Sequence, residues 1–144
     1  MTLRNILHVK GKKVFTTVPT ATLELAVRAM VEHNCGSLVV CVEGDEGQMV
    51  GIITERDILR SLAAGKQQMS QITVDEVMTK NVITGTSASM IPEIMGLMTE
   101  HRIRHLPIIE AGRLIGLISI GDVVKAQHDE LSAENHYLKE YIQQ

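Results

Sequence analysis

Aromatic side chains are scarce in this sequence of 144 residues. It has no tryptophan, and Phe15, Tyr137 and Tyr141 are its only phenylalanine and tyrosines. A surface that stacks nucleic-acid bases needs aromatic rings beside a positively charged groove. The net charge of −3 provides no general basic footprint, so we expect no nucleic-acid partner.

Cysteines and long apolar runs are also few. Cys35 and Cys41 have neither CxxC spacing nor a histidine-rich neighbourhood, which predicts reduced thiols and no required metal. No run approaches the roughly 18 apolar residues of a membrane span, and the N-terminus lacks the long apolar stretch of a signal peptide. We therefore expect a cytoplasmic protein that has no membrane partner.

The chain does contain an internal repeat. "GIITERDILR" (51–60) and "GLISIGDVVK" (116–125) share glycine, two aliphatic residues, a hydroxyl residue, aspartate, two more aliphatic residues and a base. Upstream, "MVEHNCGSLVV" (30–40) lies over "MTEHRIRHLPI" (98–108), and the similarity continues back to Val14. The offset between the two copies changes only at a predicted turn, where "EGDEGQ" in the first copy corresponds to the shorter "EAGR" in the second. We interpret this pattern as a tandem duplication.

Both copies predict the same order of elements. A short strand (14–17 and 82–85) is followed by a helix, a hairpin and a second helix that the ten-residue motif opens. The polar stretch "AAGKQQMSQIT" links the copies. A lone copy of about fifty residues would bury too little surface to be safely stable. We therefore expect an α+β fold of two β-α-β-β-α repeats, at 5–68 and 74–128, packed as a pseudo-twofold pair.

Residues 129–144 are expected to extend the last helix as a C-terminal tail. Val124, Leu131 and Leu138 recur every seven residues, although polar residues such as Glu134 between them argue against a proper coiled coil. The apolar stripe either packs on its own repeats or meets the same helix of a second chain. The second interpretation predicts a homodimer.

The shared motif places a hydroxyl residue three positions before an aspartate: Thr54 and Asp57 in one copy, Ser119 and Asp122 in the other. This spacing before an apolar helix is typical of a capping box, although the box usually has Glu or Gln at its fourth position. An aspartate in the first turn is also suited to accept hydrogen bonds from the two hydroxyls of a ribose. The two roles are compatible.

With this motif closing each copy, the sequence resembles the cystathionine β-synthase (CBS) domain, and the tandem pair resembles a Bateman module. The likeness covers roughly residues 5 to 128. It implies an adenine ligand, such as AMP, ADP, ATP or NAD, and sometimes S-adenosylmethionine. It also implies that the ligand is sensed in order to regulate a partner protein, and it assigns Thr54, Asp57, Ser119 and Asp122 to ribose binding.

Phosphate binding is predicted for Arg56, Arg104 and His105. The planar guanidinium of arginine suits phosphate, and the resemblance implies basic residues near the phosphates in the cleft between copies. Arg104 and His105 are adjacent on a predicted strand and should face opposite ways. Arg56 has Gly121 as its counterpart in the other copy, which indicates that the copies divide the phosphate chemistry.

The adenine ring would lie, by the same resemblance, beside Phe15, Ile83 and Ile103. Each of these is also an ordinary core residue. The sequence shows no nucleophile–base pair, metal constellation or P-loop, and catalysis needs one of these; we therefore expect no enzyme. The alternative to an adenine-nucleotide sensor is a structural dimerisation module with non-functional pockets. The identity of the regulated partner is not encoded in any of these motifs.

Overall fold

The computed structural model describes residues 1–11, 13–65 and 68–143. The predicted linker "AAGKQQMSQIT" includes two positions, 66 and 67, outside these ranges. The elements, in chain order, are α1 (Leu3–Lys10), β1 (Thr16–Thr17), α2 (Leu23–His33), β2 (Ser37–Val42), β3 (Asp45–Thr54), α3 (Glu55–Ala63), α4 (Val74–Val77), α5 (Ile91–His101), β4 (His105–Glu110), β5 (Arg113–Ser119) and α6 (Ile120–Gln143).

The first repeat follows the predicted order. Its sheet has the order β1-β2-β3, with β1 parallel to β2 and β2 antiparallel to β3. Thr22 caps α2 by accepting a hydrogen bond from the amide of Leu25 at 3.2 Å. The buried face of α2, with Leu23, Ala26 and Met30, then joins the strands in one apolar core. The amphipathic spacing of the sequence therefore identifies this helix face correctly.

The second repeat keeps this order except for its first strand. Helix α5 and the antiparallel pair β4–β5 form as expected. The strand predicted at 82–85 is wrong, because only a single parallel bridge forms there, between Gly85 and Ile108. Gly85 stands where the first copy has Thr17, and glycine is a poor strand residue. A turn begins one residue later, at Thr86, whose amide donates a hydrogen bond to the Ser89 hydroxyl.

The first helix of each repeat ends in the same way. Asn34 and Arg102 follow α2 and α5, lie 68 positions apart, and have left-handed backbones with φ of 50° and 54°. Asparagine tolerates this conformation better than arginine does. The duplication has therefore preserved a backbone geometry at a position where the side chain has changed.

The segments that lead into the two repeats are exchanged between the two cores. Helix α1 comes before the first strand of the first repeat, yet Leu3, Ile6 and Leu7 are buried in the core of the second repeat. Helix α4 lies at the start of the second predicted repeat, before α5, yet Val74 is buried in the core of the first. Neither helix was predicted from the sequence.

Single β-bridges accompany this exchange. Thr2 pairs with Met90, and Thr73 pairs with Thr22. Thr22 and Met90 are the N-cap residues of α2 and α5, again 68 positions apart. Each leading segment therefore enters the other repeat at the same place.

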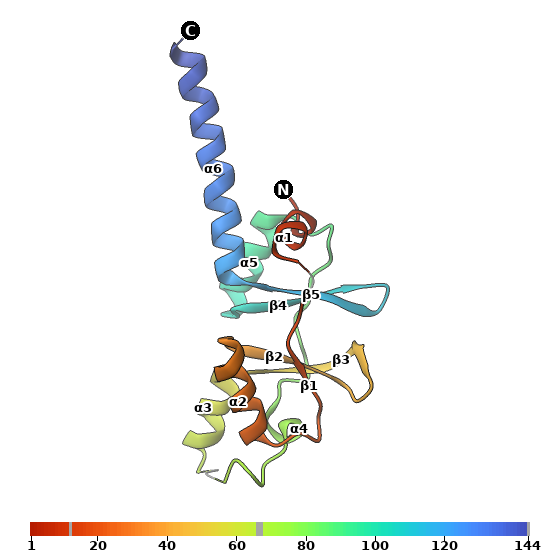
Figure 1. The fold of residues 1–144 in the computed structure, drawn as a ribbon. Helices are drawn as coiled ribbons and strands as arrows, with labels where there is room; N and C mark the ends of the chain where they lie inside the picture. The colour runs from red at the N-terminus through yellow and green to blue at the C-terminus, as the bar shows by residue number, and fades with distance from the viewer. Residues whose placement is uncertain (12, 66–67, 144) are drawn as a thin grey trace.

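The two repeats stack with their sheets toward each other and their helices on the outer sides (Figure 1). The hairpins point in the same direction, and their tips are joined by an exposed ion pair. Nη2 of Arg113 lies 2.5 Å from Oδ1 of Asp45. These residues begin β5 and β3, so they hold equivalent places in the two hairpins.

Helix α6 continues without a break from the motif into the tail, as expected, and extends well beyond the rest of the molecule (Figure 1). Its buried residue is Val123, and Glu130 is the last that is not exposed. Every described side chain from Leu131 onward is exposed, including Leu131, Leu138 and Ile142. The apolar stripe therefore does not pack on its own repeats.

Candidate functional site

The motif of the first repeat forms a reciprocal cap at the start of α3. The amide of Asp57 donates to Oγ1 of Thr54 at 3.3 Å, and the amide of Thr54 donates back to Oδ2 of Asp57 at 3.0 Å. The Thr54 hydroxyl donates to the same oxygen at 3.1 Å. The other oxygen, Oδ1, accepts a hydrogen bond from the Thr79 hydroxyl at 3.0 Å. Asp57 is 9% exposed, and both its oxygens are used inside the protein.

The motif of the second repeat forms the same cap but has a different outer partner. The amide of Asp122 donates to Oγ of Ser119 at 3.1 Å, and the Ser119 amide donates to Oδ2 of Asp122 at 2.9 Å. The ammonium of Lys10 also donates to Oδ2, at 2.5 Å, and to the carbonyl oxygen of Leu117 at 2.9 Å. In the described part of the chain, Oδ1 of Asp122 accepts no hydrogen bond.

Asp122 is charged and partly accessible. Its side chain is 26% exposed. Burial acts to raise the pKa of Asp122, but the hydrogen bonds from Lys10 and Ser119 outweigh it, so the pKa lies below its ordinary value. The carboxylate at the start of α6 is therefore an acceptor that solvent and a ligand are able to reach.

The leading segments that supply these outer partners lie close to the motif glycines. A Cβ built on Gly51 would lie 2.7 Å from the sulfur of Met78 and 2.8 Å from the carbonyl oxygen of Thr79. A Cβ built on Gly116 would lie 2.5 Å from Cδ2 of Leu7. The glycine of the motif thus permits the exchanged segment to approach the strand, and the aspartate six residues later bonds to that segment.

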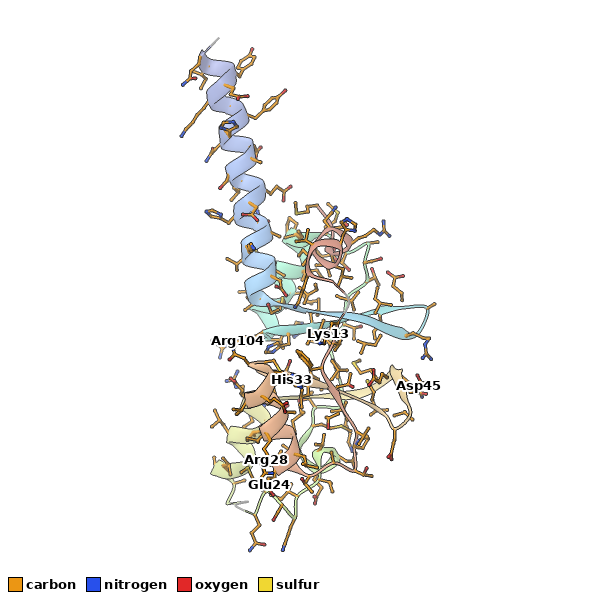
Figure 2. The ribbon with its side chains drawn as sticks, in the orientation of Figure 1. Lys13, Glu24, Arg28, His33, Asp45 and Arg104 are labelled. Atoms are coloured by element: carbon orange, nitrogen blue, oxygen red, sulfur yellow. The ribbon has the colours of Figure 1, made fainter. Side chains whose placement is uncertain are left out.

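The predicted ribose and phosphate residues of the second repeat lie together. His105 is directly opposite Ser119 in the β4–β5 register, and the amide of Ile120 donates to the carbonyl oxygen of Arg104 at 2.8 Å. The side chain of Arg104 is exposed at the level where the two repeats meet (Figure 2). The second repeat thus gathers an aspartate, a serine, an arginine and a histidine at one end of its hairpin.

His105 faces the first repeat. A Cβ built on Gly36 would lie 3.4 Å from the carboxyl carbon of Glu55 and 3.5 Å from Cε1 of His105. Burial is the main cause that lowers the pKa of His105; the charges of Lys10 and Arg104 lower it further, and those of Glu55 and Asp122 oppose them. The imidazole therefore sits among charged groups from both repeats.

Arg56 comes from the first repeat and directly follows Glu55, whose carboxyl group lies near His105. It is exposed on the first turn of α3, beside the cap made by Thr54 and Asp57. The structure therefore gives each repeat its own cationic residue, and the grouping of arginine and histidine occurs in the second repeat.

The predicted adenine residues lie at the edges of the two cores. Phe15 packs against the first core, and Ile83 and Ile103 pack against the second. The Phe15 ring also stacks on His33, with ring centroids 4.0 Å apart, and Nζ of Lys13 lies 5.2 Å from the Phe15 centroid. Each residue therefore has a packing role that does not require a ligand.

Two surface hollows lie near the other end of the hairpins. One of about 460 Å³ is bordered by β1 and the β2–β3 turn, and one of about 230 Å³ by β1, β3 and β5. Neither is lined by the predicted ribose or phosphate residues that the structure describes. The predicted ribose and phosphate residues of the second repeat lie instead at the other end of the β4–β5 hairpin, around Ser119 and Asp122. Cys41 lies beside the larger hollow. Burial, followed by the charges of Glu46 and Asp45, raises the pKa of its thiol to about 11. The thiol is therefore a poor nucleophile.

Sequence reasoning missed two residues of this arrangement, Lys10 and Thr79. Both bond to a motif aspartate from more than twenty positions away. One signal for α1 was present, because Leu3, Ile6 and Leu7 have helical spacing after Thr2. No local pattern indicates that this helix crosses to the other repeat.

Comparisons with known proteins agree with this architecture. The CBS domain family model matches residues 6–64 and 74–129. The chain is 37% identical over 148 aligned positions to "CBS domain-containing protein CBSX3, mitochondrial" of Arabidopsis thaliana, covering 99% of this chain and 72% of that protein.

In the described residues, no helix is long and apolar enough to cross a membrane, and no group of three His, Cys, Asp or Glu side chains could hold a metal ion.

Solved structures are similar over most of the chain. A CBS-domain protein from Agrobacterium tumefaciens is 38% identical, with a TM-score of 0.82 over 88% of this chain and 99% of that one. The CBS domain pair of protein MJ0100, solved with 5′-methylthioadenosine and S-adenosyl-L-methionine, is 26% identical, with a TM-score of 0.77 over 90% of this chain and 98% of that one. Two complete motifs, two matched segments and this shared fold show that the chain belongs to the CBS domain family, as a tandem pair.

Proposed function

We propose that this CBS pair is a regulatory module that binds an adenine nucleotide and changes the behaviour of a partner protein. The observation that carries the proposal is the grouping of Ser119 and Asp122 with Arg104 and His105 at the boundary between the repeats. The carboxylate offers a ribose one oxygen that makes no hydrogen bond within the described residues. The arginine offers the planar donor pair that suits phosphate.

A similar protein supports the class of ligand. Protein MJ0100 was solved with two adenosine-containing molecules. AMP, ADP, ATP and NAD share with those molecules the adenosine group that Ser119 and Asp122 would hold, and they add phosphates for Arg104. The ribose role of Thr54 and Asp57, the phosphate role of Arg56, and the adenine roles of Phe15, Ile83 and Ile103 remain predictions. So does the cytoplasmic location, because one relative is named mitochondrial.

A thermal-shift panel with AMP, ATP, NAD and S-adenosylmethionine tests the proposal. A ligand that binds the folded state stabilises it by RT ln(1 + [L]/Kd), about 2.7 kcal/mol when its concentration is one hundred times Kd. At least one of these ligands should raise the melting temperature, whereas guanosine monophosphate should do so less. A panel with no shift at millimolar concentrations would contradict the proposal.

The second candidate is a structural dimerisation module without a ligand. It is favoured by the internal partners of the motif aspartates, Thr79 for Asp57 and Lys10 for Asp122. It is also favoured by the exposed apolar residues of the α6 tail. This function predicts a stable homodimer together with no response to any adenine ligand.

A further inference from the structure

The two motif aspartates have outer partners of different charge. In the first repeat the partner of Asp57 is the hydroxyl of Thr79, a neutral donor. In the second repeat the partner of Asp122 is the ammonium of Lys10, a cation. Both donors come from an exchanged leading segment, so they hold comparable places in the fold. The second repeat therefore carries one positive charge that the first repeat lacks at this place.

The ammonium of Lys10 lies at an accessible position. The side chains of Lys10 and Asp122 are 36% and 26% exposed. The same ammonium donates to the carbonyl oxygen of Leu117, which belongs to β5. Lys10 is also the last residue of α1, and the buried residues Leu3, Ile6 and Leu7 fix this helix in the second core independently of the Lys10 side chain.

Lys10 also shares its surroundings with the predicted phosphate residues. Its charge and that of Arg104 both act on His105, after the larger effect of burial. A phosphate that contacts Arg104 or His105 would therefore come within electrostatic range of Lys10. A lysine ammonium binds phosphate as a compact point charge with three donors.

We propose that Lys10 is a specificity-determining residue of the second-repeat site, which selects phosphorylated ligands over the nucleoside. This inference rests on the proposed function. Lys10 forms an ion pair with Asp122 in the structure. When ribose hydroxyls bond to Asp122, Lys10 turns to the phosphate of the ligand. Adenosine has no phosphate, so it competes with Lys10 for the carboxylate and offers the ammonium no other anion.

The test compares AMP with adenosine by isothermal titration calorimetry. Wild-type protein should prefer AMP, and Lys10→Met should reduce that preference about tenfold or more, the effect of one hydrogen bond to a charged group. Most of the change should be weaker AMP binding, with adenosine binding unchanged or tighter. Lys10→Arg keeps the charge and should keep the preference. Lys139→Met removes the same charge from the exposed tail and is the matched control.

The possible failures are distinguishable. If wild-type protein binds neither ligand, the proposed function fails and the role of Lys10 fails with it. If it binds both and Lys10→Met weakens them equally, the role of Lys10 is overturned and the proposed function stands.

A second measurement uses only the wild-type protein, in case Lys10→Met does not fold. The Cε resonance of Lys10, assigned by NMR, should show an ordered side chain with AMP and a more mobile one with adenosine. The same response to both ligands would overturn the inference.

Discussion

The hydroxyl of Thr79 donates a hydrogen bond to Oδ1 of Asp57 at 3.0 Å, and so connects the segment between the repeats to the start of α3. Together with Thr54 it uses both oxygens of a carboxylate that is almost fully buried. The first-repeat motif therefore has a structural role that does not depend on a ligand.

Replacing Thr79 with valine should lower the free energy of unfolding by about 1 kcal/mol, because the hydrogen bond to the buried Asp57 carboxylate is lost. Thr79 itself is exposed to water, which keeps the loss at the low end for a bond to a charged group. Thr79→Ser keeps the hydroxyl and should remain close to wild type. Urea denaturation of the two variants provides the measurement. Equal stability of Thr79→Val and Thr79→Ser would show that the hydroxyl contributes nothing.

Asp122→Asn should weaken AMP binding about tenfold, because a charged acceptor for the ribose becomes neutral. Stability should change little, since asparagine is also a good capping residue. Asp57→Asn is the matched control: it should reduce stability more than AMP affinity, because both oxygens of Asp57 have internal partners. Calorimetry and urea denaturation of both variants measure the two effects. The reverse pattern would place the ligand in the first repeat.

The stability of the protein should fall in mild acid through His105. Burial lowers the pKa of His105 in the folded state, with smaller contributions from Lys10 and Arg104. The unfolded chain therefore takes up this proton at a higher pH than the folded protein does. Above the unfolded pKa of about 6.5, His105 is neutral in both states and does not reduce the free energy of unfolding. As the pH falls from there through the lower folded pKa, the unfolded state binds the proton more readily and the free energy of unfolding decreases.

His105→Gln measures this effect. Its urea midpoint should decrease less than that of wild type between about pH 7.5 and about pH 5. The exposed His136, which pairs with Glu140 on the tail, offers a control outside the two repeats. An identical decrease in wild type and His105→Gln would show that other groups cause the acid sensitivity.

Removal of residues 131–144 should leave the two repeats folded and weaken self-association. The described part of this tail has no buried side chain, so its loss should alter the unfolding midpoint of the monomer very little. A helix of about this length is marginal alone in water, which favours its pairing with a second copy. Light scattering should show a dimer for the full chain and a weaker dimer or a monomer after truncation. An unchanged dimer would place the interface on the other helices.

Arg102→Gly should stabilise the protein by about 1 kcal/mol. Arg102 has a left-handed backbone with φ of 54° after α5, a conformation that favours glycine. The matched variant is Asn34→Gly at the equivalent place after α2, where the gain should be smaller because asparagine tolerates this conformation. Thermal unfolding of both variants decides the point. A loss of stability in Arg102→Gly would mean that its side chain makes a favourable interaction.

Local patterns predicted most of the fold. The repeat follows from the similarity of the two halves of the chain. Both hairpins, the motif helices and the long last helix follow from alternation and spacing within short segments. The prediction failed at 82–85, where Gly85 replaces a strand residue, and at α1, whose partners are more than eighty residues away. Such long-range packing has no local signature in one sequence.

The same limit applied to the candidate site. The spacing of Ser119 and Asp122 predicted a cap, which the structure contains, whereas their ribose role came from the family resemblance and remains a prediction. The β4–β5 register places His105 opposite Ser119. The sequence pattern did not identify Lys10, because its contact with Asp122 depends on where α1 docks. The motif alone also did not predict that both carboxylate oxygens of Asp57 accept hydrogen bonds within the protein.

The exchange of leading segments has a consequence for how the chain folds as it is synthesised. Helix α1 is synthesised before the first repeat, but its partners in β5 and α6 are synthesised after that repeat. The first repeat, in contrast, has all its buried parts once Thr79 has emerged. Contacts between distant positions form slowly, and domains fold as units during synthesis. We therefore expect nascent chains to contain a folded first repeat while the apolar face of α1 stays exposed, and able to bind chaperones, until β5 and α6 have been synthesised.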